Sequence, residues 1–151
     1  MAGTPMPTGA KAMAAISFAV VGFIAALAYI PNMPEAGSVG SLPLGVAAIG
    51  AIVGWRVMGN SVGHGYFRAI GSGLKTMIVL VFFALLLFGI YEMLQNSVKM
   101  YYDGPQEAIL DVFQRMMDRS VPLLNGRVLA AILIGGTVAG LMTENASRRW
   151  R

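Results

Sequence analysis

The stretch Leu74–Leu94, LKTMIVLVFFALLLFGIYEML, decides the fold of this chain. It is almost entirely apolar, and its two charged residues, Lys75 and Glu92, stand near its ends. In an α-helix, about 20 consecutive apolar residues at about 1.5 Å each match the ~30 Å hydrocarbon thickness of a bilayer. The stretch therefore predicts a transmembrane helix.

Three more apolar runs, at 12–30, 43–58 and 128–146, predict further spans, of which the one at 43–58 is the shortest. Such runs also occur as buried helices of soluble proteins, but four of them leave no amphipathic helices to coat a soluble core. The first run contains Ala26-Leu27-Ala28, which has the form of a signal-peptide cleavage site. We nevertheless expect a retained span, and a single integral membrane domain over residues 1–151.

The composition supports a membrane protein and excludes several kinds of site. Hydrophobic residues make up 56% of the chain and charged residues 12%, whereas soluble domains carry about 25% charge. With no Cys and one His, the chain has no thiol nucleophile, thiolate site or His cluster for a metal. The net charge of +4 is expected to orient the chain in a membrane rather than to bind nucleic acid.

Four spans would place both termini on one side of the membrane. Seven of the 11 Lys and Arg fall on that side, and the positive-inside rule therefore predicts cytoplasmic termini. The last four residues, Arg148, Arg149, Trp150 and Arg151, are expected to anchor the chain to cytoplasmic headgroups, or else to dock another protein. The loop at 59–73 has five Gly and is expected to be a flexible connector, with His64 an exposed loop residue.

The segment between the third and fourth spans predicts an amphipathic helix over residues 105–119. Pro105 fits the first turn, and Glu107 lies near the positive end of the helix dipole. Apolar residues gather on one side of this helix and acidic residues on the other. We expect an interfacial position, with the apolar side packed on the protein's own helix ends or on a partner protein.

Small residues predict where the spans touch. Gly50/Gly54 and Gly136/Gly140 are GxxxG pairs, and Gly22/Ala26 is a pair of small residues with the same spacing. We therefore expect the first, second and fourth spans to pack closely, and the bulky third span to lie peripherally. The residues predicted to face lipid or a partner are Phe82, Phe83, Leu86, Ile109, Phe113, Met116 and Met117.

The chemistry-bearing residues are few. We find no paired carboxylates, no nucleophile with a base and no ionisable residue near the centre of a span, and we therefore predict no catalytic, cofactor or metal site. Glu92, near the outer end of the third span, is a candidate polar site for a proton or cation if it faces the bundle. The alternative is an interface acid that reaches the headgroups.

Five segments resemble the TrgA family, small membrane proteins of photosynthetic purple bacteria and their relatives that are named for a link to tellurite resistance. They are MPTGAK at 6–11, GWRVMG at 54–59, YEML at 91–94, YDGPQEA at 102–108 and RRWR at 148–151. The resemblance runs over almost the whole chain and implies a bacterial inner-membrane protein. It supplies no mechanism, and a Cys-free chain cannot handle tellurite through thiols of its own.

The sequence is compatible with two functions. The first is a non-enzymatic structural or accessory subunit that packs against a larger photosynthetic or respiratory complex, with lipids and other membrane subunits as partners. The alternative is a transporter or exporter of a small solute or oxyanion such as tellurite. Transport needs a polar path, for which the spans offer Ser17, Thr76, Thr137 and Glu92.

Overall fold

The computed structural model describes residues 8–32, 41–100 and 103–149, and every secondary-structure element in these ranges is a helix. The predicted all-α class is therefore confirmed for this part of the chain. The helices are α1 (Thr8–Tyr29), η1 (Ile30–Asn32), α2 (Leu42–Val53), η2 (Gly54–Met58), α3 (Tyr66–Val98), α4 (Pro105–Ser120), η3 (Val121–Leu124) and α5 (Gly126–Arg149).

Three helical segments are long and apolar enough to cross a membrane: Gly9–Asn32, Tyr66–Gln95 and Gly126–Arg149. They contain three of the four predicted spans. The remaining predicted span, 43–58, is also helical, because the π-helical η2 continues α2 to give Leu42–Met58. At about 25 Å this helix falls short of the ~30 Å hydrocarbon thickness, so its length alone does not establish a fourth crossing.

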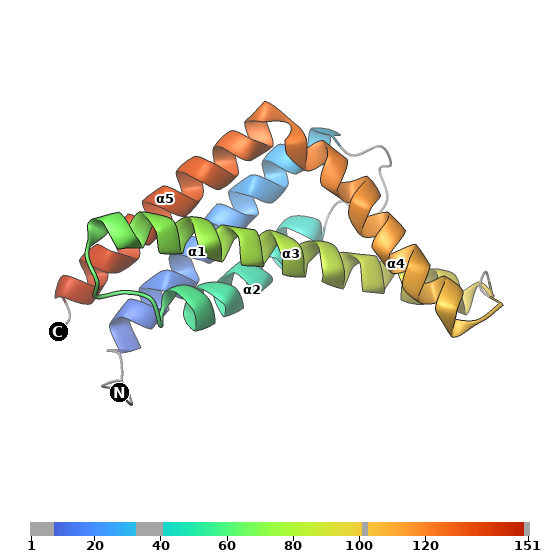
Figure 1. Cartoon of the computed structure of the whole chain (residues 1–151), viewed down its shortest axis with the longest axis horizontal. Helices are drawn as coiled ribbons and strands as arrows, with labels where there is room; N and C mark the ends of the chain where they lie inside the picture. The colour runs from blue at the N-terminus through green and yellow to red at the C-terminus, as the bar shows by residue number, and fades with distance from the viewer. Residues whose placement is uncertain (1–7, 33–40, 101–102, 150–151) are drawn as a thin grey trace.

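The α2–η2 helix runs back along α1, as Figure 1 shows. A Cβ on Gly50 would lie 2.5 Å from the Phe18 carbonyl oxygen, and one on Gly54 would lie 2.6 Å from that of Ala14. Because a side chain at either position would collide with backbone, these glycines let the two helices approach closely. The antiparallel register brings the end of η2 back to the first turns of α1.

The third predicted span, 74–94, is too short, and the loop predicted at 59–73 is partly wrong. Helix α3 begins at Tyr66 and has 33 residues, about 50 Å of helix. Its first turns are held against α5, where a Cβ on Gly140 would lie 2.5 Å from the Ala69 carbonyl oxygen. The glycines that indicated a flexible connector instead include Gly73, which faces α5 within a helix.

This contact also corrects the predicted arrangement of the spans. Helix α1 packs extensively on α2 and α5, as expected, but α3 packs extensively on α5 as well. The third span is therefore peripheral only in its second half. In its second half α3 diverges from α1 and α5, and α4 returns from the far end of α3 to the start of α5 (Figure 1). We call residues 82–98 of α3 together with α4 the α3–α4 arm.

The core lies where α1, α2, α3 and α5 meet. Its largest fully buried apolar side chains are Phe18, Met58, Met77, Leu80 and Val128. The start of α1 and the end of α5 lie at the same end of the molecule, and the tip of the arm points away from them (Figure 1). We call the end that holds the start of α1 and the end of α5 the terminal end of the molecule.

Candidate functional site

Glu92 of α3 is the centre of a polar cluster that joins α3 to α4. Its carboxylate oxygens contact the guanidinium groups of Arg115, at 3.1 Å, and of Arg119. Arg115 also donates to Asp111 at 2.7 Å, one turn earlier on α4. The hydrogen bond to Asp111, and after it the one to Glu92, raises the pKa of Arg115 above its ordinary value. Two guanidinium groups thus hold the carboxylate that was the candidate proton or cation site.

Two further hydrogen bonds tie the end of α4 to the end of α1. The Tyr29 hydroxyl donates to the Arg119 carbonyl at 2.8 Å, and the Asn125 amide donates to the Asn32 amide oxygen at 2.8 Å. Tyr29 is buried although it stands near the end of a candidate span. In the sequence it is one more residue of an apolar run, so its partner 90 positions away leaves no local signal.

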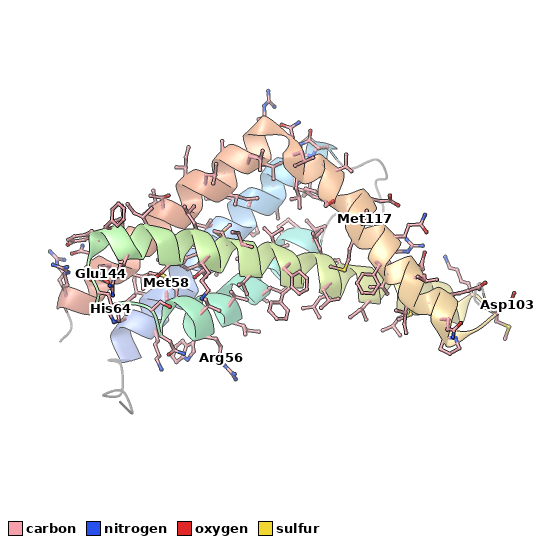
Figure 2. The ribbon with its side chains drawn as sticks, in the orientation of Figure 1. Arg56, Met58, His64, Asp103, Met117 and Glu144 are labelled. Atoms are coloured by element: carbon pink, nitrogen blue, oxygen red, sulfur yellow. The ribbon has the colours of Figure 1, made fainter. Side chains whose placement is uncertain are left out.

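A second polar cluster, centred on Glu144 of α5, lies at the terminal end of the molecule. The Glu144 side chain is 1% exposed and accepts hydrogen bonds from the backbone N–H groups of Gly63, at 2.8 Å, and Gly65, at 3.2 Å. Both glycines have positive φ, 93° and 107°, which L side chains rarely adopt. Figure 2 shows Glu144 beside the loop that carries His64, whose side chain is exposed as expected.

Glu144 is not among the residues that the sequence indicated as a site. The available signals were its i, i+4 spacing from Arg148 and the Gly63-His64-Gly65 loop, but neither connects α5 to that loop. Arg148 donates to Glu144 at 3.3 Å and lies 4.5 Å from the centre of the Tyr66 ring. One of the predicted anchor residues thus also takes part in the fold.

The remaining predicted anchor residues are Arg149, Trp150 and Arg151. Arg149 is exposed at the end of α5, where a headgroup contact is sterically open. Trp150 and Arg151 lie outside the described residues. The anchoring role therefore stays a prediction.

The structure places five of the six predicted packing residues at two interfaces. Gly22, Gly50 and Gly54 lie between α1 and α2, whereas Gly136 and Gly140 face α3. Ala26 is buried in the core among α1, α2 and α3. Gly135, the neighbour of Gly136, faces Val21 of α1 and lies in the contact between α5 and α1.

The apolar side of α4 is not covered by the protein's own helix ends, contrary to one of the two expectations. Ile109, Phe113 and Met117 are 57%, 60% and 71% exposed. Val112 is buried, and Met116 is half-buried beside Gly89 of α3. Helix α3 therefore covers only one edge of the apolar side of α4, and the rest of that side is exposed.

The predicted surface of α3 is open in the same way. Phe82 and Phe83 are 53% and 42% exposed and make an edge-to-face contact, with ring centroids 5.7 Å apart. Leu86 is half-buried, and Leu87, one residue on, is exposed instead. Large apolar side chains thus remain uncovered on both helices of the arm.

Within the described ranges, no group of three or more His, Asp or Glu is placed to hold a metal ion. The Thr76 and Thr137 hydroxyls donate to carbonyls one turn earlier on their own helices, at 2.7 and 2.8 Å. No family model, curated protein or solved structure matches the chain. The resemblance to the TrgA family therefore stays a prediction.

Proposed function

We propose that this chain is a non-enzymatic accessory subunit of a larger complex in a bacterial inner membrane, photosynthetic or respiratory, and that it docks through the exposed face of α3. The observation that carries the proposal is the divergence of α3 from the bundle. Beyond the core, α3 presents Phe82, Phe83 and Leu87 on an arm that the rest of the described chain leaves uncovered. Aromatic side chains that bury large areas are the usual anchors of protein interfaces.

The membrane placement behind this proposal has four crossings, by α1, α2 with η2, α3 and α5, and both termini in the cytoplasm. The antiparallel contact of α2 with α1 supports it, because the end of η2 returns to the end of the molecule where α1 starts. The helix ends that meet there carry basic residues: Lys11 near the start of α1, Arg56 on η2, Arg68 at the start of α3, and Arg148 and Arg149 at the end of α5. The acid at that end, Glu144, is buried and bonded.

Helix α4 completes the placement as an interfacial helix on the opposite side. Its exposed apolar residues would enter the outer leaflet, and exposed Glu107 and Asp118 would remain in water. Contact with lipid is also consistent with its charged Arg115 and Arg119, since both turn toward Glu92 on α3.

The transport alternative receives less support from the geometry. The Ser17 hydroxyl is buried and has no hydrogen-bond partner among the described residues. Thr76 and Thr137 use their hydroxyls within their own helices, and Glu92 is held by two arginines. Neither arrangement favours a polar path. If the chain did transport an oxyanion, reconstituted vesicles would show tellurite or phosphate flux above that of empty vesicles, and Glu92→Gln would alter it.

The docking proposal is tested by photo-crosslinking in native membranes. Benzoylphenylalanine is placed at Phe83 or at Leu87, and at Leu133 of α5, which is 54% exposed on a different helix, as the control. We expect the same higher-mass adduct from Phe83 and Leu87, and none from Leu133. The adduct should co-migrate with a membrane complex after mild solubilisation.

Three outcomes contradict the proposal. Equal adducts from all three positions would indicate non-specific contact. Adducts that contain only a second copy of this chain would replace the larger complex with a homo-oligomer. A chain that always migrates alone and gives no protein adduct would indicate that the α3 face is lipid-facing.

A further inference from the structure

A cavity lies between the bundle and the base of the α3–α4 arm. It encloses about 70 Å³ and is lined by α1, α2, α3, α4, η3 and α5. Ala26, Leu80 and Val128 in its wall are at most 4% exposed. Ala84, Phe88 and Ile132 are half-buried and form its more open side.

The polar groups of this cavity come from two residues. Among its lining residues only Tyr29 and Arg119 carry polar side chains. Tyr29 donates its hydroxyl proton to the Arg119 carbonyl, and Arg119 reaches Glu92 through Nη2. A guanidinium has five N–H donors, so the contact with Glu92 leaves others for a further acceptor. The cavity is therefore apolar over most of its surface, with a cationic donor where α4 ends.

We propose that this cavity binds one acyl chain of a phospholipid, with the lipid phosphate at Arg119. The inference rests on the membrane placement described under Proposed function, because only a chain immersed in lipid has this ligand around it. An apolar chain satisfies the lining without unpaired polar atoms, and a phosphate is an acceptor that arginine binds well. Glu92 then shares Arg119 with the lipid.

The size of the cavity favours a flexible chain over a rigid ring system. An engineered apolar cavity of about 150 Å³ holds one benzene molecule, and this one encloses about 70 Å³. It therefore accepts only the few methylenes nearest the glycerol, beside Arg119, while the rest of that chain follows the open side along α3. A retinoid or chlorin ring would need the helices to move apart.

The test uses the purified full-length chain, stripped of lipid in mild detergent, and measures retained lipid by native mass spectrometry. We expect phosphatidylglycerol and phosphatidylcholine to be retained at one molecule per chain. Diacylglycerol, which has the same chains and no phosphate, should be retained about tenfold less. Equal retention of diacylglycerol would overturn the assignment of the phosphate to Arg119.

Filling the cavity tests the position of the chain. Ala84→Phe should lower phospholipid retention at least fivefold, whereas Ala131→Phe should leave it unchanged. Ala131 is a matched control, since it is also half-buried but lines a separate apolar groove between α1 and α5. If Ala84→Phe does not give a monodisperse protein, Ala84→Leu serves as the milder variant. Loss of lipid in the Ala131 variant alone would assign the lipid to that groove and overturn the proposal.

A pair of variants separates headgroup binding from a structural role of the ion pair. Arg119→Gln and Glu92→Gln both break the same contact between α3 and α4. Only Arg119→Gln should lower phospholipid retention, and Glu92→Gln should keep or raise it by freeing the guanidinium. Equal losses would show that the ion pair merely holds the arm. Because no partner protein is present, failure here is distinguishable from failure of the docking proposal.

Discussion

Glu144 is nearly fully buried, and each of its carboxylate oxygens accepts a backbone N–H from the loop between η2 and α3. A buried carboxylate is costly unless hydrogen bonds and opposite charge compensate the lost hydration. Gly63, Gly65 and Arg148 supply that compensation. The residue therefore fixes the loop that sets where α3 begins.

Replacing this carboxylate should weaken the fold. Glu144→Gln leaves one amide oxygen for two N–H donors and removes the charge opposite Arg148, so the free energy of unfolding should fall by about 1–3 kcal/mol. Thermal or denaturant unfolding of the purified protein measures the change. Arg148→Gln is the control and should cost less, because that side chain is 48% exposed. Wild-type stability in Glu144→Gln would refute this role.

The glycines give a second test at the scale of single residues. Gly50→Ala should destabilise by about 1–3 kcal/mol, because its Cβ would lie 2.5 Å from the Phe18 carbonyl and must push α1 and α2 apart. Gly71→Ala, inside α3 with nothing within 4 Å of its Cβ, should stabilise by about 0.5–1 kcal/mol through helix propensity. The two variants should shift the unfolding midpoint in opposite directions, and a shared direction would contradict the packing role of Gly50.

At the scale of elements, α4 has three different sides. One side faces α3 with Val112, Arg115 and Arg119, one exposes Ile109, Phe113 and Met117, and one exposes polar residues such as Glu107 and Asp118. An amphipathic helix on the surface of a soluble protein buries its apolar residues and exposes its polar residues to water. Helix α4 instead exposes apolar residues on one side and polar residues on another. Three sides therefore fit a helix that meets protein, lipid and water at once.

Fluorescence tests whether the exposed apolar side of α4 faces lipid, as proposed. In a background with both native tryptophans replaced, Trp55→Phe and Trp150→Phe, Phe113→Trp is compared with Gln114→Trp in vesicles containing lipids brominated on their acyl chains. We expect strong quenching at position 113 and weak quenching at 114, since the two side chains point about 100° apart around the helix. Equal weak quenching would place α4 outside the bilayer.

The polar cluster around Glu92 should control how firmly α4 is held. Glu92→Gln removes the charge that pairs with both Arg115 and Arg119, so amide hydrogen exchange should become several-fold faster in α4 and stay unchanged in α5. Asp118→Asn is the control on the same helix, because that side chain is exposed. Unchanged exchange in Glu92→Gln would show that apolar contacts alone hold the arm.

At the scale of the whole molecule, the proposed four-crossing placement puts the terminal end and the tip of the arm on opposite sides of the membrane. Because the chain has no Cys, single cysteines report accessibility without background. Asp103→Cys at the tip of the arm should react with an impermeant maleimide in intact spheroplasts, and His64→Cys beside Glu144 only after permeabilisation (Figure 2). Labelling of both from the same side would overturn the four-crossing arrangement.

The class of the fold and most of the helices follow from the amino-acid sequence. Long apolar runs can satisfy their backbone in lipid only as helices, so composition and length are sufficient for that step. It also indicated the glycines at close contacts, since small residues are what allow helix backbones to approach. It did not indicate which helix each glycine faces, and so it left α3 out of the packed group.

The pairings between residues far apart in the sequence became visible in the folded chain alone. The start of α3 depends on contacts of Ala69 and Gly73 with α5, which outweigh the local preference of a glycine-rich segment for a loop. The partners of Glu92 and Tyr29, and the two backbone N–H groups that bind Glu144, lie 23 to 90 positions away and leave no periodicity in the chain. Hydropathy is a property of one segment and can be calculated from that segment alone. A hydrogen bond or a glycine contact between helices depends on two segments, and folding brings those two segments together.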